Sequence, residues 1–217
     1  MMDSLEILKE KNHIDCSNTL LDLISFEIND FENYSLGLSG GSTPKFFYEL
    51  FAAKYKEYSN IYLWTVDERH VNINDENSNQ RMINSIFSNS NLNIIEYSYD
   101  EDPGHSAKNY TSKVFSKVDK FNAAILGVGG DGHIASLFPD TTALNADEKG
   151  FVQNEVNILT RWRITSTFEL LKNVEHVYLL VTGDNKKEII KKIGKENNLP
   201  VNELIRLRKK TVLLTDQ

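Results

Sequence analysis

Short runs of apolar residues alternate with amphipathic stretches along most of this chain. The runs predict strands, and the stretches with apolar residues every three or four positions predict helices. The expected strands span 34–38, 61–66, 94–97, 121–126, 158–160, 163–167, 177–181 and 211–214. The expected helices span 14–30, 44–58, 77–87, 106–118, 185–193 and 201–207.

This order of elements predicts an α/β fold, namely a doubly wound, mainly parallel, Rossmann-like sheet with helices on both faces. Because no internal repeat or linker interrupts the pattern, we expect residues 1–217 to form a single domain. Sheets of this kind bind ligands beyond the carboxyl ends of their strands. The polar motifs that follow the strands are therefore the first candidates for a functional site.

The richest of these motifs follows the strand expected at 121–126. Four glycines lie within 127–132, and the same turn carries Asp131 and His133. Glycines let the backbone turn sharply and approach a ligand closely. Because a carboxylate and an imidazole stand two residues apart, the loop is expected to transfer protons, with His133 and Asp131 as the catalytic residues.

The same loop also fits the dinucleotide-binding pattern G-x-G-x-x-G over 127–132. That pattern requires a helix to follow at once, and Pro139 limits any such helix to one or two turns. It also requires an acidic residue at the end of the next strand, whereas Asp147 and Glu148 lie in a polar segment. These features argue against a nicotinamide enzyme.

A second motif, Ser-Gly-Gly-Ser-Thr-Pro at 39–44, joins an expected strand to an expected helix. Free N–H groups at a helix start, beside hydroxyls and glycines, form a cradle for anions. The expected ligand-binding residues here are Ser39, Gly40, Gly41, Ser42 and Thr43. Ser42 or Thr43 is also a natural helix cap, and the two interpretations are compatible.

The segment 37–41 matches the nucleophile elbow G-x-S-x-G, which would make Ser39 the nucleophile of an α/β-hydrolase. The elbow normally follows several strands, whereas 34–38 is the first strand that the pattern predicts. A hydrolase of that kind would also leave the loop of Asp131 and His133 without a role.

Basic residues stand near the other strand ends. Asp67 and Arg69 follow directly after the strand at 61–66. Arg69 suits bidentate binding of a phosphate or carboxylate, and the alternative is a surface ion pair between neighbouring residues. Lys186 stands near a helix start, where the helix dipole disfavours a cation unless an anion is bound. With Arg163 as a further candidate, these residues indicate a small anionic substrate.

Composition narrows the function classes. The 217 residues are 40% hydrophobic and carry a formal net charge of −7, with no basic cluster typical of nucleic-acid binding. The single cysteine, Cys16, excludes an internal disulfide, and the spacing of the histidines does not favour a metal site. We find no signal peptide or transmembrane run, so we expect a cytoplasmic protein without a membrane or nucleic-acid partner.

The motifs together resemble those of the 6-phosphogluconolactonases. They occur in that family's order at 39–44, 67–69 with 78–79, 127–139, 163–165 and 183–186. The related glucosamine-6-phosphate deaminases share the serine–glycine loop and Gly-Asp-Gly-His. They carry Asp-Glu-Tyr where this chain has Asp-Glu-Arg at 67–69, and Phe-Asn-Glu-Pro where it has Ser-Leu-Phe-Pro at 136–139.

The resemblance implies a fold of the sugar-phosphate isomerase type and hydrolysis of 6-phospho-D-glucono-1,5-lactone without metal or cofactor. In that case His133 is the base, Asp131 orients it, and Arg69, Arg163 and Lys186 share the phosphate and the lactone oxygen. The chain departs from the family at Asp140, where a glycine is usual, and at 160–162, before Arg163.

Two alternatives from other classes remain open. A sugar-phosphate isomerase or deaminase needs a second carboxylate near the histidine loop, and Asp140 is the only acidic residue shortly after His133. A non-catalytic sugar-phosphate-binding domain of the same fold is the other alternative. Such regulators commonly carry an N-terminal DNA-binding domain, for which the thirty or so residues before 34–38 leave little room. For the partner, we expect a phosphorylated sugar lactone, bound by a monomer or small homo-oligomer.

Overall fold

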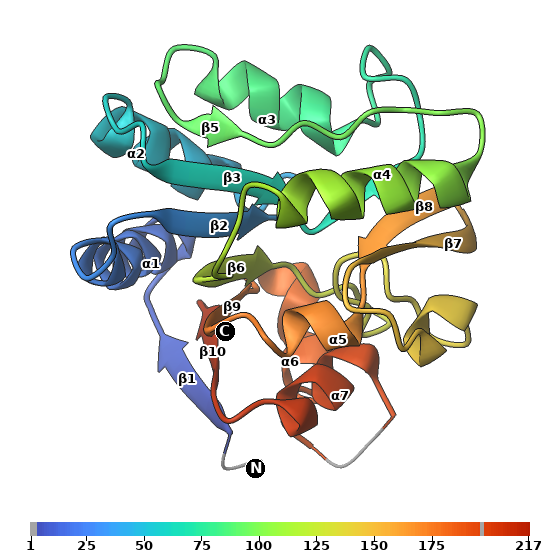
Figure 1. The fold of residues 1–217 in the computed structure, drawn as a ribbon. Coiled ribbons are helices and arrows are strands. Elements are labelled where there is room, and N and C mark those ends of the chain that lie inside the picture. Colours follow the sequence, from blue (N-terminus) through green and yellow to red (C-terminus); the bar gives the residue numbers. More distant parts are fainter. Residues whose placement is uncertain (1–3, 196–197) are drawn as a thin grey trace.

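A computed structural model describes residues 4–195 and 198–217 of the chain. Its main element is a seven-stranded sheet in the order β1-β10-β9-β6-β2-β3-β5, in which every neighbouring pair is parallel. Its strands are β1 (Leu5–Lys9), β2 (Tyr34–Leu38), β3 (Ile61–Thr65), β5 (Asn93–Ile94), β6 (Ala123–Leu126), β9 (His176–Leu180) and β10 (Thr211–Thr215). The α/β prediction is confirmed (Figure 1).

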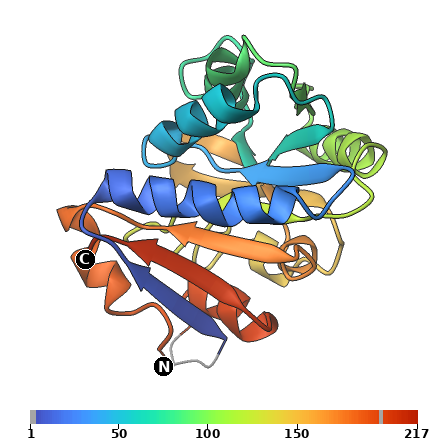
Figure 2. The same ribbon diagram turned by 90° about the vertical axis from the view of Figure 1, so that its left-hand side faces the viewer.

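Helices cover both faces of this sheet. The helices are α1 (His13–Ile28), α2 (Lys45–Tyr55), α3 (Asn79–Phe87), α4 (Pro103–Phe115), α5 (Phe168–Leu171), α6 (Lys187–Ile190) and α7 (Pro200–Leu207), with 3-10 turns at Thr142–Asn145 and Asp184–Lys186. One hydrophobic core lies between the sheet and the helices α1, α2 and α3. A second lies between the other face of the sheet and the helices α4, α5, α6 and α7. Figure 2 shows α1 lying across the first of these faces.

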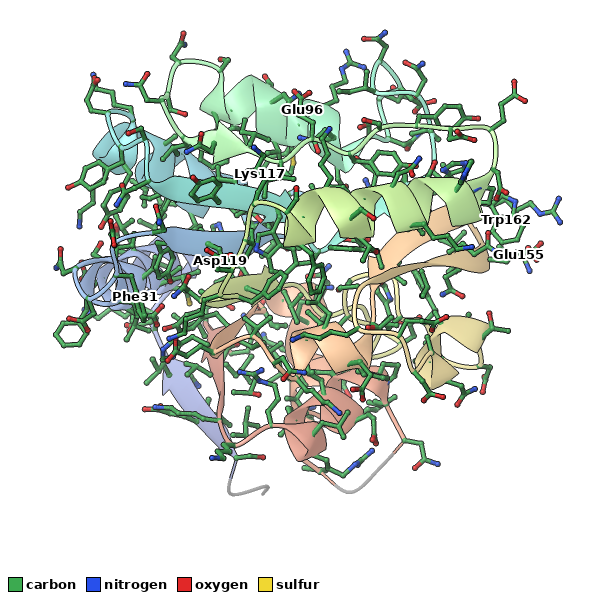
Figure 3. All side chains as sticks on the ribbon, viewed as in Figure 1. Phe31, Glu96, Lys117, Asp119, Glu155 and Trp162 are labelled. Carbon is green, nitrogen blue, oxygen red and sulfur yellow. The ribbon has the colours of Figure 1, made fainter. Side chains whose placement is uncertain are left out.

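A three-stranded antiparallel sheet lies beside the main one. It consists of β4 (Asp67–Arg69), β8 (Thr160–Ser166) and β7 (Phe151–Ile158), in the order β4-β8-β7. Helix α4 packs against β7 and β8. The hairpin of β7 and β8 extends to the edge of the molecule, where Glu155 and Trp162 lie side by side (Figures 1 and 3).

Several predicted boundaries were wrong. The strand expected at 158–160 is the turn of this hairpin, where Leu159 has a φ of 61°. The helix expected at 185–193 is a 3-10 turn followed by the four-residue α6. Strand β1 was missed because its apolar and polar residues do not alternate cleanly, and its presence makes β2 the second strand of the chain.

The topology reverses direction between β2 and β6, which are neighbours in the centre of the sheet. After β2 the chain adds β3 and β5 on one side, and after β6 it adds β9 and β10 on the other side, where the first strand, β1, pairs with β10 at the edge. Loops that leave two such strands separate and open a crevice at the carboxyl edge. The serine–glycine loop (39–44) follows β2, and the histidine loop (127–139) follows β6, so both loops border this crevice.

Candidate active site

A cleft of about 340 Å³ lies at this edge of the sheet. It brings together the predicted site residues of four different segments: Ser39, Gly40, Gly41, Ser42, Thr43, Asp67, Arg69, His133 and Lys186. Of the predicted residues, Asp131 and Arg163 do not line it. The cleft is therefore built from the segments that follow β2, β3, β6 and β9.

Asp131 lies directly behind His133. The His133 Nδ1 atom is 2.6 Å from Asp131 Oδ1, and the backbone N–H of His133 donates to the same oxygen at 3.2 Å. When Nδ1–H donates to the carboxylate, the free lone pair of the imidazole is on Nε2. This geometry supports the predicted pairing of a base with the carboxylate that orients it.

Two further contacts hold the His133 ring in place. Phe138 stacks on it with ring centroids 4.0 Å apart and an interplanar angle of 27°. The Gly129 N–H donates to the His133 carbonyl at 2.9 Å, and a Cβ at Gly129 would overlap both the ring and the Asp131 carboxylate. A glycine at 129 thus allows the close approach of Asp131 and His133, and no α-helix directly follows this loop, unlike in the dinucleotide-binding pattern.

The serine–glycine loop passes close to the start of α3. A Cβ at Gly40 would overlap the amide of Asn79, and Gly41 has a φ of +90°. Helix α2 is preceded by Pro44, without a side-chain cap, so the prediction that Ser42 or Thr43 caps it was wrong. Their hydroxyls are consequently not engaged by the helix they precede.

The Ser39 hydroxyl is buried and has no hydrogen-bond partner within the described parts of the chain. The Ser39 carbonyl accepts a hydrogen bond from Tyr48 at 2.8 Å, which anchors the end of β2. A serine nucleophile needs a base within hydrogen-bond reach, and the Ser39 hydroxyl makes no hydrogen bond to any histidine among the described residues. This arrangement argues further against a nucleophile elbow.

Asp67 and Arg69 lie on the same side of β4, facing the cleft. Asp67 is buried and its Oδ2 accepts from the Ser136 hydroxyl at 2.6 Å. Arg69 Nη1 donates to the Asn77 carbonyl at 2.8 Å. No ion pair among residues 4–195 and 198–217 includes Asp67 or Arg69, so the alternative of a surface pair is not supported.

Lys186 reaches from the 3-10 turn after β9 into the histidine loop. Its Nζ donates to the Val128 carbonyl at 2.7 Å, and its side chain lines the cleft. The neighbouring Lys187 instead pairs with Asp184 at 2.8 Å on the outer surface. Of these two lysines, Lys186 is therefore the one placed to meet a bound anion.

Arg163 is the one predicted cation that does not line the cleft. It lies on β8 directly opposite Arg69, is 3% exposed, and donates to the Ile158 carbonyl at 2.8 Å. Burial lowers the pKa of its guanidinium. Its side chain thus lies outside the lining of the cleft, and the expectation that it contacts substrate finds no support in this arrangement. The antiparallel register that places Arg163 beside Arg69 could not be predicted from local sequence.

The prediction also missed residues that shape the cleft. Asn79 lines the cleft and is 1% exposed, but the sequence indicated it only as part of the motif at 78–79. Phe138 and Ser136 follow His133 in the sequence, and they contact His133 and Asp67 respectively. The sequence signal for them was their position in the histidine loop, but only the folded contacts show their roles.

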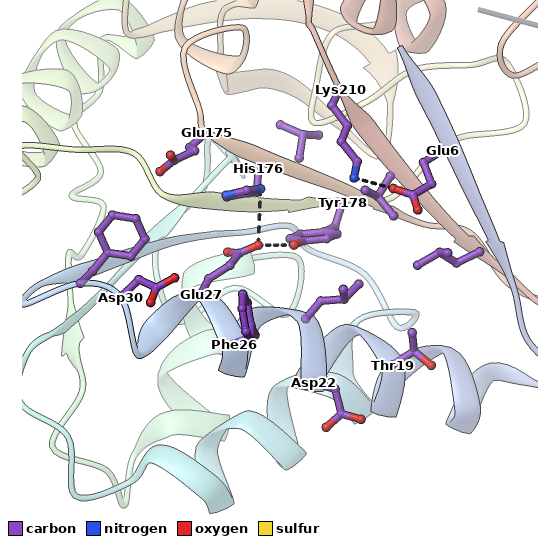
Figure 4. A pocket seen from close by; sticks show the side chains of 15 residues that line it. Glu6, Thr19, Asp22, Phe26, Glu27, Asp30, Glu175, His176, Tyr178 and Lys210 are labelled. Atoms are coloured by element: carbon purple, nitrogen blue, oxygen red, sulfur yellow. Dashed lines mark hydrogen bonds and ion pairs between the residues drawn. The ribbon is translucent and has the colours of Figure 1, made fainter. Parts of the chain in front are cut away.

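A larger cavity of about 620 Å³ lies elsewhere, between α1 and the strands β1, β9 and β10 (Figure 4). At its floor Glu27 accepts hydrogen bonds from the hydroxyls of Tyr34 and Tyr178 and lies 3.5 Å from His176 Nδ1. Burial raises the pKa of the Glu27 carboxyl. No predicted site residue lines this cavity, so we assign the candidate active site to the smaller cleft.

The described residues offer neither a metal site nor a membrane-spanning helix. Within them, no three histidine, cysteine or acidic side chains are grouped in a way that would hold a metal ion. Over the same residues, the helices are too short or too polar to cross a bilayer.

The chain is similar in sequence and in structure to proteins of one known family. Residues 10–213 match the family described as glucosamine-6-phosphate isomerases/6-phosphogluconolactonase. A 6-phosphogluconolactonase of Chlamydia pneumoniae is 33% identical over 178 residues, which cover 76% of this chain and 68% of the relative. The crystal structure of 6-phosphogluconolactonase from Thermotoga maritima matches with a TM-score of 0.86 and 26% identity, covering 97% of this chain and 98% of that one.

A monomeric glucosamine-6-phosphate deaminase matches almost as well in three dimensions. Its TM-score is 0.84 at 19% identity, covering 98% of this chain and 97% of that one, so the likeness shows the fold alone. Fold does not distinguish the two activities, and the discrimination depends on the residues of the cleft. The sequence and structural matches together show that the chain belongs to the glucosamine-6-phosphate isomerase/6-phosphogluconolactonase family.

Proposed function

We propose that this protein hydrolyses 6-phospho-D-glucono-1,5-lactone to 6-phospho-D-gluconate in the oxidative pentose phosphate pathway. The observation that carries the proposal is the Asp131–His133 pair, with Nδ1 and Oδ1 2.6 Å apart, beside a cleft that also contains Arg69 and Lys186. One cleft thus combines a general base with two cations. The names of the matched relatives support the same activity.

The reaction needs a base, a water molecule and a positioned lactone. His133 Nε2 takes a proton from water while the water oxygen bonds to the lactone carbonyl carbon. The resulting tetrahedral oxyanion collapses, the bond between carbon and the ring oxygen breaks, and the ring oxygen takes the proton back from the imidazolium. Asp131 stabilises that imidazolium and keeps the ring in the tautomer that the first step requires.

The phosphate and the oxyanion both need positive or donor groups. Arg69 and Lys186 supply charge, and the hydroxyls of Ser39, Ser42 and Thr43 with the amides of Gly40 and Gly41 supply donors. Asp67 lies among them as a hydrogen-bond acceptor for sugar hydroxyls. We expect a monomer or small homo-oligomer that works in the cytoplasm without a cofactor.

An assay with lactone generated by glucose-6-phosphate oxidation tests the proposal. We expect the protein to accelerate lactone disappearance well above its spontaneous hydrolysis, and to release no ammonia from glucosamine 6-phosphate. Ammonia release without lactone hydrolysis would assign the deaminase activity instead. Tight binding of 6-phosphogluconate with turnover of neither substrate would assign a binding domain.

A further inference from the structure

Glu68 is a buried carboxylate between two residues that face the cleft. Strand neighbours point to opposite sides, so Asp67 and Arg69 face the cleft while Glu68 points away from it toward α3. Its side chain is 1% exposed and does not line the cleft. The mechanism above gives it no role, although it lies at the centre of the Asp-Glu-Arg motif.

Both oxygens of Glu68 accept hydrogen bonds from the segments that form the cleft. Oε1 accepts from the backbone N–H of Arg69 and from that of Asn79, each at 2.7 Å. Oε2 accepts from the backbone N–H of Gln80 at 2.6 Å and from the Ser78 hydroxyl at 3.2 Å. A single carboxylate thus joins β4 to the first turn of α3.

The charge of Glu68 has no cationic partner within residues 4–195 and 198–217. The amide groups at the start of α3 and the helix dipole are what favour it there. Burial nevertheless raises the pKa of this carboxyl to about 7, which means that the ionised form costs stability. A buried carboxylate that accepts four hydrogen bonds and does not line the cleft fixes the positions of the groups that donate to it.

Those positions lead directly to the cleft. The side chain of Asn79 extends from the first turn of α3, whose backbone donates to Glu68, and its Nδ2 donates to the Asp67 carbonyl at 2.9 Å. Its Oδ1 is buried without a partner among the described residues, and it lies where a Cβ on Gly40 would be. The start of α3 therefore sets the distance between β4 and the serine–glycine loop.

We propose that Glu68 is a positioning residue for substrate binding, which holds the Arg69 backbone and Asn79 so that Arg69 and the loop 39–43 face one ligand. The proposal rests on the proposed function for its kinetic test. It predicts that loss of the carboxylate loosens the half of the cleft formed by β4 and α3. The other half, with His133 and Asp131, depends on the loop after β6 and remains in place.

The test compares Glu68→Gln with Glu27→Gln. Glutamine keeps the size of the side chain but replaces one acceptor oxygen with a donor, which cannot face the N–H groups of Arg69, Asn79 or Gln80. Glu27 is the matched control because it is also a buried carboxylate that accepts from hydroxyls, yet it lies under the cavity of Figure 4 and not at the cleft. Both variants and the parent protein are assayed for KM and kcat with the phosphorylated lactone.

For Glu68→Gln we expect KM to rise on the order of tenfold, as the loss of about one charged hydrogen bond does, with kcat changed less than about threefold. Glu27→Gln keeps both constants, whatever its melting temperature. Unchanged KM in Glu68→Gln, with only a lower melting temperature, would show a merely structural carboxylate and overturn the proposal. A fall in kcat at constant KM would overturn it as well.

Hydrogen exchange separates this result from a failure of the proposed function. If the parent protein does not hydrolyse the lactone, the function is wrong, and the positioning role is then judged on the amides of Arg69, Asn79 and Gln80 and on the affinity for inorganic phosphate. We expect Glu68→Gln to lose protection at these amides and to bind phosphate more weakly than Glu27→Gln does. Equal protection and equal affinity in the two variants would overturn the role of Glu68.

Discussion

At the scale of single residues, the cleft contains charged side chains that face the ligand and backbone groups that hold these side chains in position. Lys186 and Arg69 donate to backbone carbonyls, of Val128 and Asn77 respectively, and neither pairs with an acid in the described parts of the chain. A carbonyl orients a cation without neutralising it. Both cations therefore keep their charge for an anionic substrate.

Lys186→Ala tests this arrangement. We expect it to weaken binding of the phosphorylated lactone and of 6-phosphogluconate by about 1.5–3 kcal/mol, the worth of a charged hydrogen bond. Turnover of unphosphorylated gluconolactone changes little. Lys187→Ala, which removes a neighbouring lysine paired with Asp184, is the control and leaves both substrates unaffected. Equal losses on the two lactones would mean that Lys186 supports catalysis or the fold instead of binding phosphate.

Ser39→Ala tests the identity of the nucleophile. Because water attacks in the proposed mechanism, we expect the variant to keep partial activity, with a loss of about 2- to 10-fold for one neutral hydrogen bond to substrate. A serine-directed phosphonate leaves the parent protein unlabelled, as mass spectrometry of the intact chain will show. A stoichiometric adduct at Ser39 would contradict the mechanism.

At the scale of the elements, loops from β2, β6 and β9 reach one edge because all three strands run in parallel. The small β4-β8-β7 sheet adds the fourth side of the cleft through Asp67 and Arg69. Glu68 joins β4 to α3 through hydrogen bonds, and burial raises the pKa of its carboxyl. This pair of elements is therefore where pH should affect stability.

The pH dependence has a definite sign. The pKa of Glu68 is about 7 in the folded chain and about 4.5 in the unfolded one, so the folded protein binds this proton more tightly. The stabilising contribution of Glu68 is full below pH 4.5 and is lost as pH rises through about 7, by at most about 3 kcal/mol.

Urea unfolding of the parent and of Glu68→Gln at pH 5 and pH 8 measures this effect, since other titrating groups cancel in the difference. We expect the free energy of unfolding of the parent, relative to the variant, to be larger at pH 5 than at pH 8. A difference that is constant between the two pH values would show that Glu68 titrates normally.

At the scale of the whole molecule, the parallel sheet was predictable because its central strands are short apolar runs with helices between them. Strands β2, β3, β6 and β9 are almost wholly buried, which gives them that signal. In the antiparallel sheet the sequence predicted part of β8, as the strand expected at 163–167, but not β7 or β4. Strand β7 carries polar residues on one side, and β4 is only three residues long. Neither feature stands out from a loop in the sequence.

The site residues likewise divide into those with a local sequence signal and those whose positions depend on long-range contacts. His133, Lys186 and the loop 39–43 were predictable because each follows a buried strand, and such ends meet at one edge. The position of Arg163 beside Arg69 could not be predicted because it depends on pairing between β4 and β8, segments almost a hundred residues apart. Glu68 could be predicted only as a member of the Asp-Glu-Arg motif at the ligand edge, because its hydrogen bonds to α3 are long-range contacts that no local pattern encodes.

The central claim is that His133, oriented by Asp131, activates water for lactone hydrolysis. The most direct measurement is the turnover of freshly generated phosphorylated lactone by His133→Ala, corrected for spontaneous hydrolysis, with the affinity for 6-phosphogluconate measured on the same sample. We predict a loss of kcat of about 10²–10⁴-fold, as removal of a general base produces, with affinity nearly unchanged. Turnover near that of the parent in a folded His133→Ala protein would contradict the account.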